Sequence, residues 1–298
     1  MIPAGHVPVL LEETLSYLDT GRAGTYIDGT IGLAGHSLEI LKRNPRASVV
    51  GFDRDEISLR EAQKRLDGYG DRVRLYHADF RDLPQNEIDR DSVRGILLDL
   101  GISSFQLDAP ERGFSFNADG PLDMRFDRRV KMTAARILEK YPESRLDEMF
   151  RNYGELPQTR RLAREIVSRR KLRPFETTAD LRRLVEEIYR WRPQKGKSHP
   201  AARVFQALRI EVNGELAGLA EFLERMILWI KPGARLVVIS FHSLEDRVVK
   251  RMFAAQSETA ERAPRLKILT RKPVEASEAE LAVNSRARSA KLRAAERI

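Results

Sequence analysis

The segment DGTIGLAGHS, residues 28–37, holds the most informative combination of residue types and spacing in the chain. The segment follows directly on the apolar run 25–27, and its glycines, Gly29, Gly32 and Gly35, recur at every third position. An apolar-periodic stretch comes next, so the order predicts a strand, a glycine-rich turn and a helix. Glycines let a backbone approach a ligand closely, and the free amides at a helix start favour an anionic group. The segment therefore indicates either a plain structural turn or a site for a nucleotide-like cofactor that carries a carboxylate or phosphate.

Acidic residues lie at or just beyond the ends of four strand-like segments: Asp28, Asp53, Asp79 and Asp99. Ligands of open parallel sheets lie beyond the carboxyl ends of the strands, near the point where the strand order reverses. An acid at the end of the second strand, Asp53, is well placed to accept two hydrogen bonds from ribose hydroxyls. Each aspartate alone is as well explained as the cap of the helix that follows it. Four of them in register favour a nucleoside site.

Two cofactors fit such a site, NAD and S-adenosylmethionine. The glycine spacing differs from the Gly-x-Gly-x-x-Gly of dinucleotide sites, which counts against NAD. The phrase IKPGARLVVIS, residues 230–240, resembles the element that precedes the fifth strand of many class I methyltransferases. We therefore expect S-adenosylmethionine as the cofactor, and a nicotinamide-dependent dehydrogenase remains a weaker alternative.

The elements that must position these residues alternate between strand-like and helix-like patterns. A helix is expected at 56–66, and strands are expected at 48–53, 72–80, 93–101, 235–241, 266–270 and 289–295. Apolar strands separated by helices predict an α/β fold with a parallel sheet and helices on both faces.

About 130 residues separate the strands at 93–101 and 235–241, far more than a crossover needs. The apolar residues of this stretch recur with helical periodicity, Thr177 and Asp180 have the spacing of a capping box, and a further helix at about 214–230 returns the chain to the sheet. We therefore expect a discontinuous sheet domain, 1–106 and 207–298, that is interrupted by a helical domain, 107–206.

The composition narrows the class of protein. The 298 residues include no cysteine, which excludes disulfides, thiolate metal sites and thiol nucleophiles. The five histidines lack paired ligand spacing, so no metal site is expected. No apolar run is long enough to cross a membrane and the start lacks a basic leader, so we expect a cytoplasmic protein without a membrane partner. The net charge of +9 points to a polyanionic partner, most simply nucleic acid.

A resemblance to a known family rests on six phrases in one order: DGTIGLAGHS, DLGISSFQLDAPERGFSFNADGPLDMRFD, RPFETTADL, HPAARVFQALRIEVNGEL, VISFHSLEDRVVKRMF and NSRARSAKLRAAER. They resemble the bacterial MraW/RsmH family from His6 to the C-terminus. Its members are class I S-adenosylmethionine-dependent methyltransferases of the N4 amine of a cytidine in the decoding region of 16S rRNA. The resemblance implies a Rossmann-like sheet with an inserted all-helical substrate-recognition domain. It also implies 16S rRNA in the small ribosomal subunit as the partner, and leaves a homodimer open.

Matching positions imply the cofactor-binding residues of this chain. The glycine turn would hold the methionine end, Asp53 the ribose, and Phe80 would lie beside the adenine. Three positions depart from the family's pattern, because Ala34 replaces a glycine, Phe105 a proline and Leu156 a glutamate. A methyl group at position 34 is tolerable only if that residue keeps a negative φ. The full implied set is Ala34, Gly35, His36, Asp53, Phe80, Asp99 and Gln106.

Methyl transfer to an exocyclic amine needs acceptors that orient the amine protons and stabilise the charge developing on nitrogen. Asp99 is the first candidate, with Ser103 in the same segment, and the alternative is that Asp99 only contacts the cofactor. His242, at the end of the fifth strand, is a candidate contact to the target base. Ser243 and Asp246 have capping-box spacing, which predicts the start of a helix there.

An aromatic ring commonly holds a base that has left its RNA environment. The candidates are Phe105, Phe114, Phe116 and Phe241, and for each of them core packing is the alternative.

Two arginine-rich stretches are candidates for contacts to RNA phosphates. They supply Arg160, Arg161, Arg164, Arg169 and Arg170 in the insert and Arg286, Arg288, Lys291 and Arg293 in the C-terminal tail. The tail also has residues that can pack inward, such as Ala290 and Leu292.

Two other classes of protein stay open. One is a methyltransferase that acts on DNA or a protein amine, and the other is an RNA-binding assembly factor with a vestigial pocket, which Ala34 would explain.

Overall fold

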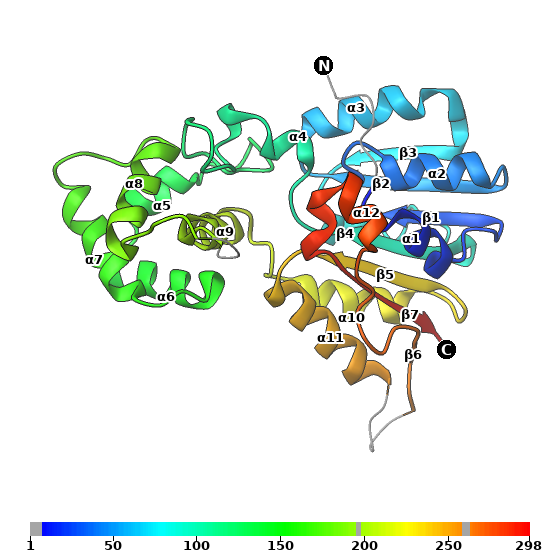
Figure 1. Cartoon of the computed structure of the whole chain (residues 1–298). Coiled ribbons are helices and arrows are strands. Elements are labelled where there is room, and N and C mark those ends of the chain that lie inside the picture. Colours follow the sequence, from blue (N-terminus) through cyan, green and yellow to red (C-terminus); the bar gives the residue numbers. More distant parts are fainter. Residues whose placement is uncertain (1–7, 195–197, 258–262) are drawn as a thin grey trace. The chain divides into compact units, whose positions relative to one another are not determined.

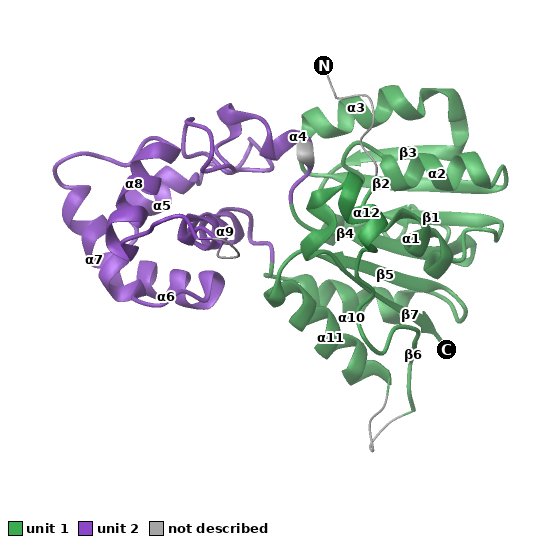
Figure 2. Cartoon of the chain, viewed as in Figure 1, with its two compact units in different colours: residues 1–101, 216–298 green, residues 102–215 purple. Residues whose placement is uncertain are grey.

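The computed structural model describes residues 8–194, 198–257 and 263–298. The chain forms two compact units, and Figure 2 colours them separately. Residues 1–101 and 216–298 form the first, which we call the sheet unit, and residues 102–215 form the second, the helical unit. The predicted insert, 107–206, lies inside the helical unit.

Within the described residues the sheet unit holds a single sheet of seven strands, in the order β3-β2-β1-β4-β5-β7-β6 (Figure 1). Strands β1 to β5 pair in parallel, and β7 pairs antiparallel with both β5 and β6. The order reverses between β1 and β4. This arrangement confirms the predicted α/β class. The strands are β1 Gly24–Asp28, β2 Ala47–Asp53, β3 Val73–His77, β4 Val93–Asp99, β5 Arg235–Ser240, β6 Leu266–Ile268 and β7 Lys291–Arg297.

Helices cover both faces of this sheet, because successive residues of each central strand point to opposite sides. Ile27 packs into one apolar cluster, with α10 and α11, and its neighbour Tyr26 packs into the other, with α1 and α2. The helices of this unit are α1 Leu11–Leu18, α2 Gly35–Arg43, α3 Glu56–Leu66, α10 Leu219–Trp229, α11 Ser243–Ser257 and α12 Glu278–Val283, with short 3-10 turns η1 Asp67–Arg72, η2 Phe80–Asp82, η3 Arg90–Ser92 and η5 Ser285–Ser289.

The helical unit has its own apolar core. Thr177 and Asp180 form the predicted capping box at the start of α8. Leu156 is buried in this core, so the position where the family has a glutamate serves packing here. The elements are α4 Ser104–Leu107, η4 Pro110–Arg112, α5 Ala134–Lys140, α6 Glu143–Gly154, α7 Thr159–Arg169, α8 Thr178–Tyr189 and α9 Pro200–Asn213.

Several element boundaries differ by a few residues from the sequence prediction; β3, for example, ends at His77 and not at residue 80. The helix expected from about 214 begins only at Leu219, because Gly218 caps it in the left-handed region at φ 75°. Helix α11 begins at Ser243 as expected, but His242 caps it: its Nδ1 accepts a hydrogen bond from the amide of Glu245 at 3.4 Å. Asp246 pairs with Arg293 instead of capping the helix, so the predicted helix start is confirmed and only the capping residue differs.

The C-terminal tail completes the sheet. Strand β7 lies between β5 and β6, and the tail residues expected to pack inward, Ala287, Ala290, Leu292 and Ala294, are fully buried. Among the described residues, no helix has both the length and the apolar character that crossing a membrane requires.

Candidate active site

The glycine turn lies where the strand order reverses. It is tied to β4 by two hydrogen bonds: the amide of Gly29 donates to the carbonyl of Leu97 at 2.9 Å, and the amide of Asp99 donates to Oγ1 of Thr30 at 2.6 Å. A side chain at position 29 would collide with Leu98, because a Cβ there would lie 2.5 Å from its Cδ2. The carboxyl ends of β1 and β4 are thus held together at the place where such sheets bind ligands.

Asp28 closes the turn from within. Its Oδ2 accepts a hydrogen bond from the hydroxyl of Ser37 at 2.6 Å, and its Oδ1 accepts one from the amide of Thr30 at 3.2 Å. Burial raises the pKa of Asp28 to about 6, although both hydrogen bonds oppose the shift. The side chain is 3% exposed. Its contacts make Asp28 a structural residue of the turn.

Asp53 holds the other side of the same turn. Its Oδ2 accepts from the amide of Gly32 at 2.8 Å, and its Oδ1 accepts from the amide of Asp55 at 2.7 Å. Burial raises the pKa of Asp53 to about 7 despite these two bonds. Each carboxylate oxygen has two lone pairs, so both oxygens retain capacity for a hydroxyl donor.

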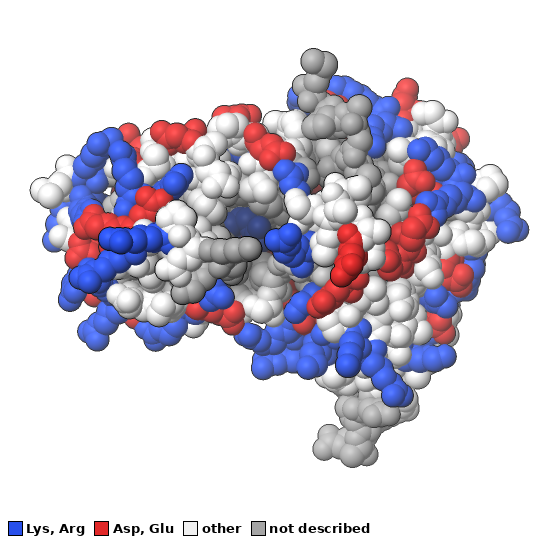
Figure 3. Space-filling view, in the orientation of Figure 1, with Lys and Arg blue, Asp and Glu red and all other residues white. Residues whose placement is uncertain are grey.

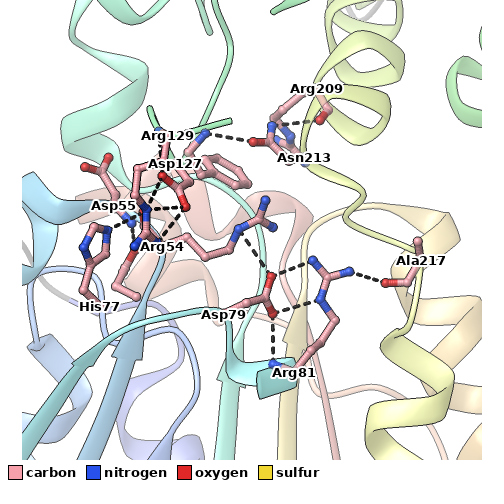
Figure 4. Close-up of polar contacts among 12 residues, drawn as sticks. Arg54, Asp55, His77, Asp79, Arg81, Asp127, Arg129, Arg209, Asn213 and Ala217 are labelled. Atoms are coloured by element: carbon pink, nitrogen blue, oxygen red, sulfur yellow. Dashed lines mark hydrogen bonds and ion pairs between the residues drawn. The ribbon is translucent and has the colours of Figure 1, made fainter. Parts of the chain in front are cut away.

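Asp79 and Phe80 follow β3, and Figure 4 shows the arginines around Asp79. Burial would raise the pKa of Asp79, but Arg81 donates to both of its oxygens, at 2.8 and 2.6 Å, and with Arg54 holds that pKa below its usual value. Arg81 also donates to the carbonyl of Ala217. Asp79 therefore anchors two guanidinium groups. The half-buried ring of Phe80 lies next to it on the strand end.

Asp99 ends β4 beside His36. Its Oδ2 lies 3.6 Å from Nδ1 of His36, whereas its Oδ1 is buried and has no hydrogen-bond partner within the described part of the chain. Burial, together with the carboxyl groups of Asp28 and Glu245, raises the pKa of Asp99 well above its ordinary value. An orphaned buried oxygen at a ligand-binding edge indicates that a bound molecule completes its hydrogen bonding.

The backbone conformation of Ala34 differs from the negative φ that was expected for an alanine at this position. Its φ is 61°, in the left-handed region, and not negative. This conformation costs an L-residue roughly 1–2 kcal/mol, and the surrounding core, in which Ala34 is 0% exposed, holds the residue in it. Alanine therefore occupies the turn in a left-handed conformation, which glycine adopts at no steric cost.

Helix α2 starts at the end of the turn, immediately after Ala34. The first hydrogen bond of its ladder runs from the amide of Leu38 to the carbonyl of Ala34, at 2.9 Å. The amides of residues 35–37 therefore point out of the helix end, where the helix dipole favours a negative group.

Ser103 and Gln106 form a reciprocal pair in the helical unit. The amide of Gln106 donates to Oγ of Ser103 at 3.2 Å, and the amide of Ser103 donates to Oε1 of Gln106 at 3.1 Å. This is a capping box for the short helix α4, and it gives Ser103 a structural task.

His242 is held by its own helix. Its Nε2 lies 3.2 Å from Oε1 of Glu245, and Oε2 of Glu245 accepts from the amide of Phe241 at 2.9 Å. Because Nδ1 accepts an amide hydrogen, the ring hydrogen lies on Nε2. Capping accounts for the contact of Nδ1, whereas the buried Nε2 has no hydrogen-bond partner within the described part of the chain.

The candidate aromatic rings differ in surroundings. Phe114 is buried and stacks on Phe126 at 5.4 Å, so it belongs to the core of the helical unit. Phe116 is half-buried and stacks on His199 at 5.0 Å. Phe105 and Phe241 are also half-buried.

The arginines of the insert fall into two groups. Arg160, Arg161 and Arg164 are exposed on α7. Arg169 pairs with Glu187 at 2.5 Å, and Arg170 donates to the carbonyls that end α5, those of Leu138 and Tyr141. Arg170 therefore fixes the end of α5, and we no longer count it among the candidate RNA contacts.

The candidate cations of the C-terminal tail also differ in their exposure. Arg288 is exposed, and Arg286 and Lys291 are half-buried. Arg293 is 7% exposed and forms a two-pronged ion pair with Asp246, at 2.6 and 3.1 Å. That guanidinium is unsuited to clamp a phosphate, and we remove Arg293 from the candidates.

Sequence reasoning missed the residues that hold the acidic ones in place: Thr30, Ser37, Arg54, Arg81 and Glu245. Thr30 and Ser37 were visible as hydroxyl residues inside the glycine turn, a signal that could have identified them. The start of α11 was predicted, but no local pattern specified the contacts of Glu245.

Comparisons with known proteins identify the family of this chain. A profile of the MraW methylase family matches residues 3–298. A ribosomal RNA small subunit methyltransferase H of Carboxydothermus hydrogenoformans is 48% identical over 308 residues, covering 98% of each chain. The protein of the same name from Oleidesulfovibrio alaskensis is 48% identical over 310 residues, 98% of this chain and 95% of that one. A crystal structure of an rRNA methylase from Streptococcus thermophilus aligns with a TM-score of 0.43 at 11% identity, over 100% of this chain and 99% of that chain. The chain therefore belongs to the MraW methylase family of S-adenosylmethionine-dependent methyltransferases.

Proposed function

We propose that the protein methylates the N4 amine of a cytidine, the one at position 1402, in the 16S rRNA of the small ribosomal subunit. The names of the relatives support the small-subunit rRNA as the substrate. The family resemblance of the site residues supports the cytidine amine as the acceptor. Such a substrate implies action in the cytoplasm, where small subunits assemble.

The observation that carries the proposal is the group of carboxyl groups at the carboxyl ends of β1, β2 and β4, where Asp28 is buried and Asp53 and Asp99 are half-buried. Asp28, Asp53 and Asp99 all have raised pKa values, chiefly because of burial. Such a site is stabilised by a positive charge and repels phosphate. S-adenosylmethionine supplies an electrophilic methyl group on a positively charged sulfonium, which suits this site, whereas the pyrophosphate of NAD does not.

The residues present fit the parts of this cofactor. The amides of residues 35–37 at the start of α2 would bind its carboxylate. Asp53 would accept hydrogen bonds from the ribose hydroxyls, and the exposed part of Phe80 would contact the adenine. Gln106 and Ala34 complete the set that the family resemblance implies.

Asp99 is proposed to orient the target amine. In a cytosine the lone pair of the amine nitrogen is delocalised into the ring, so the enzyme must direct it toward the methyl carbon. Oδ1 of Asp99 is an acceptor with unused capacity, and one amine hydrogen can satisfy it. The same oxygen stabilises the positive charge that develops on the nitrogen. Ser103 caps α4 and Nδ1 of His242 caps α11, and a ring hydrogen on Nε2 cannot accept an amine hydrogen, so Asp99 is the principal candidate.

The helical unit is proposed to recognise the RNA. Arg160, Arg161 and Arg164 project from α7 into solvent, and Figure 3 shows Lys and Arg gathered along the edge of the unit that carries this helix. Their charges would contact phosphates, with Arg288 in the tail as a further contact.

Transfer of a labelled methyl group from S-adenosylmethionine to small subunits that lack the modification tests the proposal. Nuclease digestion and mass spectrometry of the nucleosides should identify N4-methylated cytidine. Label in another nucleotide, in DNA or in a protein amine would refute the stated acceptor. No label in any assembly state would refute the activity.

A single variant separates the two candidate roles of Asp99, as the group that orients the amine or as a contact to the cofactor. Asp99→Asn keeps the shape but loses the charge, and we expect the turnover to fall by about 10²-fold or more with little change in affinity for S-adenosylhomocysteine. A large loss of affinity with unchanged turnover would instead make Asp99 a cofactor contact. Absence of binding heat in the wild type at micromolar concentrations would support the vestigial-pocket alternative.

A further inference from the structure

His36 is held at both ring nitrogens inside the core of the sheet unit. Its Nε2 lies 3.0 Å from the carbonyl oxygen of Val9, and its Nδ1 faces Oδ2 of Asp99 at 3.6 Å. A carbonyl oxygen can only accept, so Nε2 carries a hydrogen. Nδ1 then carries either a lone pair, in a neutral ring, or a second hydrogen, in an imidazolium.

The charged groups around Asp99 determine how many protons the pair of Asp99 and His36 holds. The charged groups that face its carboxyl group are Asp28 from β1, Glu245 from α11 and His36 from α2. Two of these three are acidic. An ionised Asp99 opposite a neutral His36 would place a carboxylate against the lone pair of Nδ1. The pair therefore needs one proton, and that proton lies either on Asp99 or on His36.

We propose that His36 and Asp99 share one proton, and that in the active enzyme His36 carries it, so that Asp99 faces the target amine as a carboxylate. His36 is then a positioning residue that acts through Asp99. This inference rests on the proposed function, because it assigns the partner that keeps the amine-orienting group ionised. It also gives a reason why the ring is anchored on the carbonyl of Val9: the anchor turns Nδ1 toward Asp99.

The proton balance of the transfer follows from this arrangement. The nitrogen–methyl bond forms as the methyl–sulfur bond breaks, and the electron pair of the broken bond stays on sulfur. The nitrogen then bears a positive charge and loses one proton to Oδ1 of Asp99. The protonated carboxyl group beside the imidazolium returns that proton to water, which restores the starting state.

The pH dependence of methyl transfer tests the inference. In the wild type, kcat/KM should fall at low pH, where Asp99 is protonated, and at high pH, where the imidazolium is lost. The acid and alkaline limbs of this profile report the titration of Asp99 and His36 as a coupled pair. In His36→Gln the side-chain amide can still donate to the carbonyl of Val9, but no positive charge from this side chain faces Asp99. We expect a loss of at least about tenfold in kcat, no alkaline limb, and an acid limb moved to higher pH.

His77→Gln is the matched control. The ring of His77 also contacts a backbone carbonyl, that of Arg54, at 3.2 Å, so the same substitution is made in the same kind of contact. This variant should keep both limbs of the wild-type profile. A His36→Gln enzyme that is slower but keeps both limbs would overturn the inference, because a merely structural role lowers the rate without moving the profile.

A second measurement does not depend on activity. The nitrogen-15 resonances of the five histidine rings, recorded with S-adenosylhomocysteine bound, report the charge of each ring. The signal missing in His36→Gln identifies His36. Hydrogen on both of its nitrogens between the two limbs supports the inference, and a bare Nδ1 there overturns it. If wild-type protein fails to methylate small subunits, the proposed function fails, while these spectra still decide the state of the pair.

Discussion

The hydroxyl group of Ser37 donates a hydrogen bond of 2.6 Å to Oδ2 of Asp28 inside the core of the sheet unit. The pair joins the end of β1 to the first turn of α2, and it thereby fixes the glycine turn that lies between them. The carboxyl group gains this bond in a place where it is almost fully removed from water. The ionisation state of Asp28, and with it the pH, therefore affects the stability of the glycine turn.

Asp28→Asn should make the apoprotein less sensitive to alkaline pH. Burial raises the folded-state pKa of Asp28 from 3.8 to about 6, so the folded protein binds more protons than the unfolded chain between these values. The stabilising contribution is complete below about pH 4 and is lost as the pH rises through about 6. The asparagine can keep both hydrogen bonds, since its amide can donate to Oγ of Ser37.

Urea unfolding at pH 5 and pH 8 measures this effect. At each pH the free energy of unfolding of the variant is compared with that of wild type. This difference should be more favourable to the variant by about 1–2 kcal/mol at pH 8 than at pH 5. Asp67→Asn, at an exposed position after α3, removes the same charge and should show no such difference. Equal shifts at both pH values for Asp28→Asn would contradict the prediction.

The affinity for S-adenosylhomocysteine should fall with decreasing pH because of Asp53. Its pKa is raised to about 7, mainly by burial, so most of the carboxyl group is protonated at pH 6 and loses acceptor capacity toward ribose hydroxyls. Calorimetric titration should show an association constant up to about tenfold lower at pH 6 than at pH 8. Asp53→Ala should bind more weakly and without this pH dependence. A wild-type affinity that is constant over this range would argue against Asp53 as the ribose ligand.

The left-handed conformation of Ala34 makes a prediction about two substitutions. Ala34→Gly relieves roughly 1–2 kcal/mol of backbone strain, but it loses a buried methyl group worth about 0.8 kcal/mol and increases the freedom of the unfolded chain. We expect stability within about 1 kcal/mol of wild type and full binding of S-adenosylhomocysteine. Ala34→Val should lose several times more, because a β-branched residue resists positive φ and the site is fully buried. Denaturant unfolding of both variants gives the comparison, and tolerance of valine would contradict it.

The order of the sheet elements was predictable because each of them carries its own periodic signal. Helix α3 starts and ends where its apolar spacing predicts, at Glu56 and Leu66, and β2 begins one residue before the predicted strand. The acidic strand ends were predictable for the same reason, since the strands place them. The contacts of those acids were not, because they join residues distant in the sequence, such as the 69 positions between Thr30 and Asp99.

The conformation of Ala34 shows where local rules fail. Propensity alone predicts negative φ for alanine, yet Asp53, on a neighbouring strand, binds the amide of Gly32 and helps to hold the turn in the shape that puts residue 34 at positive φ. For α11 the start of the helix was predicted correctly, but the residue that caps it was not. His242 and Glu245 have no sequence pattern as common as the one formed by Ser243 and Asp246, and the latter acid is taken by Arg293 on β7. Tertiary contacts outweighed the local preference in both cases.

Removal of the exposed arginines on α7 should weaken RNA binding in a salt-dependent way. Arg160→Gln with Arg164→Gln should lower the affinity for small-subunit rRNA and reduce the slope of log K against log salt concentration by about 2, one for each phosphate contact. Stability should change little, since both side chains are exposed. Arg60→Gln, at an exposed position on α3, is the control and should leave the slope unchanged. Filter binding over a salt series provides the measurement, and an unchanged slope in the double variant would remove α7 from the RNA surface.

Removal of Arg293 should lower stability and leave RNA binding unchanged, in contrast to removal of the exposed arginines on α7. Its ion pair with Asp246 is largely buried, with side chains 9% and 14% exposed. Arg293→Met leaves the carboxylate of Asp246 without its partner, and we expect a loss of about 3–5 kcal/mol in the free energy of unfolding. A second substitution, Asp246→Leu, removes the stranded charge and should restore most of that loss. At temperatures where the variants remain folded, the salt dependence of RNA binding should equal that of wild type. A normal stability with a reduced salt slope would show that this guanidinium reaches RNA, and it would return Arg293 to the candidate RNA contacts.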